Sequence, residues 1–188
     1  MRRDFPVPLG EAALGRAAYV RRLTAEMAGA LVRALAMKKN ERISAYVGQL
    51  GADPGLGLEP CYQGYFTCFN AGQYYEAHDV LEHLWLRTRG ADYLFFKGLI
   101  QVAGAFVHLQ KQHLHPAHPK HATRLRPAVR LFHLAMANLD PYAPRHWQLD
   151  VAALVRLCRE LAAEIVASDF TRNPWHPDRA PQLHLRPA

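Results

Sequence analysis

Apolar residues recur at helical spacing through most of this 188-residue chain, and no segment alternates apolar and polar residues as a half-buried strand would. Segments rich in glycine and proline separate the helical ones, most clearly at residues 51–55. This pattern predicts an all-α fold. We expect a single compact bundle of about five core helices, preceded by a long N-terminal helix.

Three parts are expected along the chain. Residues 1–50 form a helical extension, with one continuous apolar stripe over residues 9–39 and a shorter helix after it. Residues 59–169 form the core domain, with helices expected at 60–71, 73–89, 91–112, 127–139 and 151–165. Residues 170–188 form an extended, proline-bearing tail. Its Trp175, Leu183 and Leu185 suggest that the tail lies on the core.

The formal net charge of +7 makes acidic partners worth considering. However, the lysines and arginines are scattered, and no aromatic residues alternate with them as they do on a single-strand-binding surface. Nucleic-acid binding is therefore the least favoured of the function classes considered.

Two further features bear on the compartment. No apolar run reaches the roughly 18 residues of a membrane span, and the amino terminus lacks the pattern of a secretion signal. We expect a soluble, cytoplasmic protein with no membrane partner. Three cysteines, Cys61, Cys68 and Cys158, have neither the number nor the spacing of a disulfide framework, so Cys61 and Cys68 are expected to be small core residues.

The helix expected at residues 73–89 carries an unusual density of acid, base and metal-ligand types: Glu76, His78, Asp79, Glu82 and His83. At 100° per residue, His78 and Glu82 border the apolar face, and because they are four residues apart their side chains can touch. Glu76, Asp79 and His83 fall on the opposite side, where we expect a solvated stripe.

The following helix, expected to be the central one, has a polar line that includes Lys97, Gln101 and His108. A connection of about four residues makes the two helices an antiparallel hairpin at the centre of the bundle. In an antiparallel pair, two residues lie opposite each other when their residue numbers add up to the same total as those of a neighbouring opposed pair. Glu82 should face Lys97 and His78 should face Gln101, whereas His108 lies roughly 10 Å further along the axis.

Two interpretations of these polar groups are open. They can satisfy one another as a structural network, because each would otherwise lose its water without compensation. They can also line a pocket. If the pocket holds a divalent metal, His78 and Glu82 are the candidate ligands. If it is catalytic, His78 is the candidate general base and Glu82 orients it.

A second candidate site is a loop with four histidines within nine residues, His113, His115, His118 and His121. Four imidazoles could hold a transition metal. Two prolines keep the loop irregular, however, and no carboxylate or thiolate joins the histidines. A solvated loop is the alternative, and the sequence does not decide between them.

Two sequence blocks resemble a known family. FNAGQYYEAHDVLEHLW at 69–85 and FKGLIQVAGA at 96–105, followed by His108, are similar to the signature of the prokaryotic family catalogued as domain of unknown function 309. The resemblance spans about residues 59–169 and implies a compact all-helical domain, with no established activity. The motif's histidine, acid, glutamate and tryptophan correspond to His78, Asp79, Glu82 and Trp85. Asp79 stands where the family usually has glutamate, and its shorter reach counts against a ligand role.

The leading hypothesis is a binding module with a polar pocket between two antiparallel helices. Its occupant would be a small ligand, an ion or a protein partner, and homo-oligomerisation through the first helix is a further option. The ligand-binding candidates are His78, Glu82, Trp85, Lys97, Gln101 and His108. The alternative is a metal-dependent or acid/base hydrolase that uses His78 and Glu82, and the second alternative is a nucleic-acid-binding protein.

Overall fold

The computed structural model describes residues 39–186. The helix predicted for residues 9–39 therefore lies almost wholly outside the described residues. The chain divides into two units, Met1–Arg42 and Ile43–Ala188. Apart from residues 39–42, the fold and the sites described below belong to the second unit.

The described residues are mostly helical, which confirms the predicted all-α class. The helices are α2 (Lys39–Leu50), α3 (Pro60–Asn70), α4 (Tyr74–Trp85), α5 (Tyr93–Leu114), α6 (Pro119–Ala122), α7 (Leu125–Leu139) and α8 (Val151–Ala167), with the 3₁₀ helices η1 (Pro54–Leu56), η2 (Asp140–Tyr142) and η3 (Pro177–Arg179).

A small antiparallel sheet was not predicted. It pairs β1 (Arg145–His146) with β2 (Leu149–Asp150). The two residues between the strands, Trp147 and Gln148, have φ values of 45° and 63°. A two-residue hairpin loop of this kind needs positive φ at both positions and usually takes asparagine and glycine there, so a tryptophan and a glutamine gave no sequence signal.

The start of α3 follows the sequence prediction. The Glu59 carboxylate accepts hydrogen bonds from the backbone N–H of Cys61 at 2.6 Å and of Tyr62 at 3.4 Å. Pro60 occupies the first turn, where its missing N–H costs nothing. Gly72, with φ of +72°, lies just past the end of the helix, as expected for the residue that reverses the chain there.

The end of α4 differs from the prediction. The helix was expected to continue to Arg89, but it ends at Trp85. The hydroxyl of Thr88 donates to the Leu84 carbonyl at 2.9 Å, and the Arg89 guanidinium donates to the carbonyls of Leu86 and Thr88. These side-chain bonds satisfy backbone acceptors that the helix leaves open at its end. The connection to α5 consequently covers residues 86–92, longer than the four residues expected.

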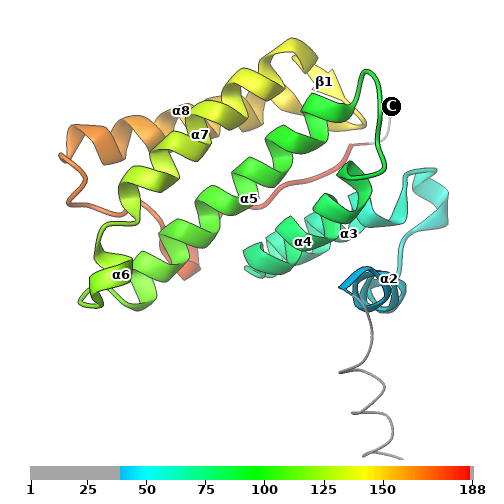
Figure 1. The fold of residues 1–188 in the computed structure, drawn as a ribbon. Helices are drawn as coiled ribbons and strands as arrows, with labels where there is room; N and C mark the ends of the chain where they lie inside the picture. The colour runs from blue at the N-terminus through cyan, green and yellow to red at the C-terminus, as the bar shows by residue number, and fades with distance from the viewer. Residues whose placement is uncertain (1–38, 187–188) are drawn as a thin grey trace, which may run out of the picture. The chain divides into compact units, whose positions relative to one another are not determined.

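Helix α5 is the central helix of this unit, as predicted. It packs against α4 on one side and α7 on the other, while α3 packs on α4 and α8 on α7 (Figure 1). The Phe106 ring of α5 lies 5.0 Å from the Phe69 ring of α3 and 5.7 Å from the Phe132 ring of α7, measured between centroids. All three rings are fully buried. Burial of such rings is the main favourable term that joins the helices.

The C-terminal tail lies against the core, as the sequence suggested. Trp175 and Leu183 are buried, and Leu185 packs against the core from a partly buried position. The side chain of Asn70 donates to the carbonyl of Leu183 and accepts from its N–H, both at 2.8 Å. This reciprocal pair holds the tail beside the end of α3.

Two further predictions can be compared with the described residues. Cys61, Cys68 and Cys158 are buried free thiols, and burial raises the pKa of Cys158 to about 12. None of the helices within residues 39–186 has both the length and the apolar character needed to cross a membrane.

Candidate metal centre

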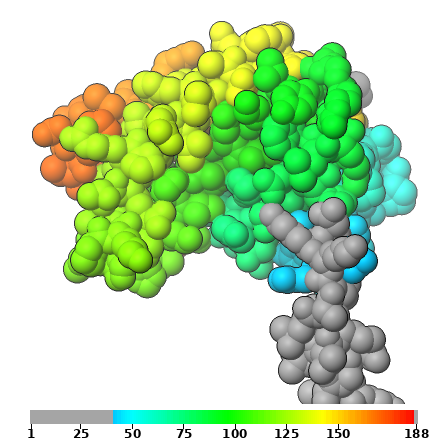
Figure 2. Space-filling model, viewed as in Figure 1, coloured from blue at the N-terminus to red at the C-terminus, as the bar shows by residue number. Residues whose placement is uncertain are grey.

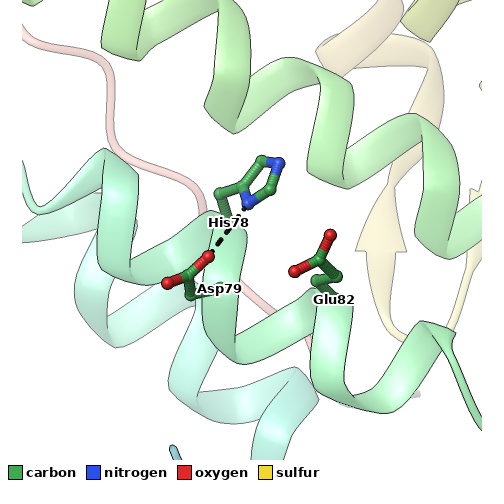
Figure 3. Close-up of side chains that lie close together, drawn as sticks. All are labelled: His78, Asp79 and Glu82. Carbon is green, nitrogen blue, oxygen red and sulfur yellow. Dashed lines mark hydrogen bonds and ion pairs between the residues drawn. The ribbon is translucent and has the colours of Figure 1, made fainter. Parts of the chain in front are cut away.

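Helix α4 places three potential metal ligands together. Glu82 is four residues after His78 and three after Asp79, and both spacings bring side chains to neighbouring positions on a helix. One possible ligand atom from each of the three residues lies within 4.8 Å of the others (Figure 3). Among residues 39–186, no other group of three or more histidine, cysteine, aspartate or glutamate side chains brings its possible ligand atoms this close together.

The trio is half-buried. The Nδ1 atom of His78 lies 3.4 Å from Oδ1 of Asp79, and their side chains are 33% and 22% exposed. In the close-up, His78 and Glu82 extend to the same side of α4 and Asp79 lies beside the imidazole (Figure 3). An ion bound here would be partly shielded from water, which strengthens its attraction to the carboxylates.

The donor types fit a borderline transition metal. One imidazole nitrogen and two carboxylates form a set that suits ions such as Zn²⁺, Mn²⁺ or Fe²⁺. Three protein ligands also leave at least one coordination position for water or a ligand. The trio can therefore hold a cation and keep it accessible.

The surroundings of Asp79 differ from those expected from the sequence. Asp79 was expected on the solvated side of α4 and away from His78, but it is half-buried and its carboxylate reaches the imidazole. The helical wheel gives only the direction in which each Cβ leaves the helix, whereas rotation about the side-chain bonds brings consecutive residues into contact. The three-residue step from Asp79 to Glu82 was the available signal.

The other two residues of the expected solvated stripe differ from each other. Glu76 is exposed, as predicted. His83 is half-buried, and burial together with the nearby Arg87 guanidinium lowers the pKa of its imidazole. Part of the expected stripe is thus covered by neighbouring groups.

Gln101 and His108 on α5 have partners that the sequence did not indicate. The Oε1 atom of Gln101 accepts from Nδ2 of Asn138, on α7, at 2.8 Å. Nδ1 of His108 lies 3.1 Å from Nη1 of Arg124, at the start of α7. Both contacts tie α5 to α7, so these two residues have roles outside the hairpin of α4 and α5.

Trp85 and Lys97 complete the set of predicted residues. The Trp85 ring packs on Tyr93, with centroids 5.1 Å apart, and its buried indole N–H has no hydrogen-bond partner among the described residues. Lys97 is half-buried on α5. The expected pairing of Lys97 with Glu82 stays a prediction.

A hollow of about 320 Å³ lies on a different part of the second unit. It is bounded by the end of α2, η1, α3 and the C-terminal tail, and its polar lining includes Gln63, Thr67, Asn70 and His184. The side chain of Gln63 is fully engaged there, since it binds the backbone of Asp53 and Leu58. This hollow is separate from the pocket that was expected between α4 and α5.

The four histidines of the second candidate site do not come together as metal ligands. The His113 ring packs against Trp175 and His176, with centroids 5.2 and 5.1 Å away. The rings of His115 and His118 lie 5.4 and 4.6 Å from that of His121. Nδ1 of His121 accepts from Arg124, and Nδ1 of His118 accepts from the backbone of Lys120. Among residues 39–186, no three of these histidines bring ligand atoms as close together as His78, Asp79 and Glu82 do.

Comparison with protein families supports the resemblance seen in the sequence. Residues 62–119 match the family described as domain of unknown function (DUF309). The matched segment contains most of α3, all of α4 with the three clustered side chains, and all of α5. It is shorter than the expected 59–169 and stops before α7 and α8. No curated protein and no solved structure matched the chain.

Proposed function

We propose that this protein is a binding module for a divalent transition-metal ion, which His78, Asp79 and Glu82 hold on α4. The observation that carries the proposal is the convergence of one nitrogen and two oxygen donors within 4.8 Å. Around a tetrahedral zinc ion, ligand atoms at bond lengths near 2.0–2.1 Å are about 3.3 Å apart. The His78–Asp79 distance of 3.4 Å already has this value, and small side-chain rotations would bring in Glu82.

The mixed donor set favours a transition metal over Ca²⁺ or Mg²⁺. Calcium and magnesium bind oxygen ligands, and calcium takes six to eight of them in its usual sites. An imidazole instead suits zinc, iron or nickel, and two carboxylates neutralise the charge of a divalent ion. Zn²⁺ is therefore the first ion to test, together with Mn²⁺, which the two carboxylates suit, and with Ca²⁺ as the comparison.

The metal-dependent form of the hydrolase considered from the sequence would use the same ion, whereas the acid/base form would use His78 as the general base without it. A metal with an open position lowers the pKa of bound water and supplies a nucleophile. His78 would then be a ligand rather than the general base. Metal binding must be established before metal-dependent hydrolysis can be tested, and binding is the function that we propose.

The test is calorimetric titration of the chelator-treated full chain with Zn²⁺ and Mn²⁺. The wild-type chain should bind one equivalent. Asp79→Asn and Glu82→Gln preserve size and remove one negative charge each, and each should weaken binding at least tenfold, since even outer-shell changes cost about 10–100-fold. Glu76→Gln is the matched control, because it makes the same change at an exposed position of the same helix.

Two results would count against the proposal. One is equal weakening by Glu76→Gln and Glu82→Gln, which would mean that only the general charge of α4 attracts the ion. The other is absence of metal binding by the wild type together with a large loss of melting temperature in His78→Ala. That combination would assign the trio to a structural network.

A further inference from the structure

The segment between Asp92 and Asp140 has an extreme charge composition. Residues 93–139 contain six lysines or arginines and six histidines, and no aspartate or glutamate. The segment forms α5, α6 and α7. The lysines and arginines of these helices can therefore pair with a negative charge only outside the segment or in a bound ligand.

Arg124 lies at the centre of this segment's polar contacts. Its Nε donates to Nδ1 of His121 at 2.6 Å, and its Nη1 is 3.1 Å from Nδ1 of His108. A guanidinium has only donors and stays charged, so each imidazole must accept through an unprotonated Nδ1. Two neutral rings thus face the Arg124 charge, which they do not neutralise.

Other cations surround the same point. Burial, with Arg124, Lys111 and Arg130, lowers the pKa of His108 to about 4. Burial, with Arg124, the two neighbouring histidines His118 and His115, and Lys111, also lowers the pKa of His121. Lys111 on α5 and Arg124 at the start of α7 therefore act on both rings, and the local potential is positive.

We propose that Arg124, His108, His121 and Lys111 form a binding site for the phosphate group of a small ligand. A guanidinium has five N–H donors, of which Arg124 uses two for the imidazoles, so donors remain for an oxyanion. Arginine and phosphate form strong, charge-assisted hydrogen bonds. A phosphate would also supply the counter-charge that residues 93–139 lack.

The site is accessible. Arg124, His108 and His121 are half-buried, and the neighbouring His115, His118 and Lys120 are exposed. In the space-filling view, the atoms around α6, in yellow-green, form a continuous surface with the start of α7 (Figure 2). A ligand could approach Arg124 from this surface while its charged group lies against half-buried donors.

A bound phosphate leaves a specific signature on the histidines. A dianion next to His108 and His121 favours their protonated forms, so it should raise the pKa of both rings and convert them into donors. Imidazole NMR titrations with and without inorganic phosphate measure this change. An ion held loosely by general positive charge would leave the two titrations unchanged.

The binding experiment is calorimetric titration of the full chain with inorganic phosphate at low ionic strength. Arg124→Gln should weaken binding at least tenfold. Arg124→Lys keeps the charge but loses the planar fork, so it should bind with intermediate affinity. Arg159→Gln is the control, because it removes the same charge from an exposed position on α8. It should change the affinity by less than twofold.

A second variant distinguishes a loss of phosphate binding from a loss of folding. Lys111→Gln does not disturb the bonds of Arg124 to the imidazoles, and it should weaken phosphate binding while circular dichroism stays unchanged. Parallel titrations with glycerol 3-phosphate identify the source of the phosphate: tighter binding of the ester indicates an organic phosphate, and equal binding indicates the free ion. Equal effects of Arg124→Gln and Arg159→Gln would overturn the proposal. So would retention of a single-stranded oligonucleotide without binding of either small phosphate.

Discussion

The indole N–H of Trp175 donates to the hydroxyl of Tyr74 at 3.0 Å, and both side chains are buried. Tyr74 is the first residue of α4, and Trp175 belongs to the C-terminal tail. The tail is thus fastened to the first turn of the helix that carries His78, Asp79 and Glu82. Any loosening of the tail should reach the candidate metal centre through this bond.

Trp175→Phe is expected to destabilise the fold. It leaves the buried Tyr74 hydroxyl without its donor, and an unsatisfied buried group costs about 1–3 kcal/mol. Urea denaturation of the variant measures the loss. In a double-mutant cycle, Tyr74→Phe combined with Trp175→Phe should cost less than the sum of the two single changes. Additive costs would show that the hydrogen bond contributes nothing. Tyr75→Phe, at an exposed neighbour, should change stability by less than about 0.5 kcal/mol.

Gly98→Ala is expected to force α5 and α7 apart. A Cβ atom at Gly98 would lie 2.6 Å from Cγ and 2.9 Å from Cδ2 of Leu139, a fully buried residue. Overpacking of this kind costs about 1–3 kcal/mol. Thermal or urea denaturation measures the change.

Gly48→Ala is the matched control on α2. A Cβ atom there meets nothing within 4 Å. Alanine favours the helix over glycine by up to about 1 kcal/mol, so this variant should be slightly more stable than the wild type. If the two alanine variants behaved alike, close contact between α5 and α7 would not be the reason for glycine at position 98.

The helices could be predicted because their signals are local. The apolar spacing of α5, the proline in the first turn of α3 and the reversal at Gly72 each depend on a few consecutive residues. Asp150 is a further example, since aspartate is a preferred N-cap residue and its carboxylate accepts from the Ala153 N–H at 2.8 Å at the start of α8. Such features do not require knowledge of the tertiary structure.

The site was less predictable because it depends on side-chain torsions and distant partners. The helical wheel placed Asp79 on the solvated side of α4, because the wheel angle describes only the direction of its Cβ atom. Gln101 contacts Asn138 and His108 contacts Arg124, and neither spacing follows a helical period. Only the packing of α5 on α7 brings these pairs together. The lack of acidic residues between 93 and 139 was the sequence signal for Arg124.

Acid should destabilise the protein partly through His108. Its pKa is about 4 in the folded chain, against an ordinary value of 6.5. Between these values the unfolded chain binds more protons, so the free energy of unfolding rises with pH. The contribution is complete above pH 6.5 and is lost as the pH falls towards 4. Because the ring is half-exposed, we discount the full shift to about 1–2 kcal/mol.

His108→Gln isolates this contribution. Glutamine can still accept from Arg124 but does not titrate. In phosphate-free buffer, the variant should lose about 1–2 kcal/mol less stability than the wild type as the pH falls from about 7 to about 4. His133→Gln changes an exposed histidine on α7 and should follow the wild-type curve. Parallel curves for His108→Gln and the wild type would contradict the assignment.

Metal binding by His78, Asp79 and Glu82 should also raise the free energy of unfolding. An ion that binds only the folded chain raises the free energy of unfolding by about 2.7 kcal/mol at one hundred times its dissociation constant. Urea denaturation of the wild type with Zn²⁺ and with chelator should differ by this amount. Asp79→Asn should lose most of the difference, because removing one carboxylate weakens the ion's attraction to the remaining ligands. Glu76→Gln should keep it. A zinc effect that survives in Asp79→Asn would place the ion at other residues.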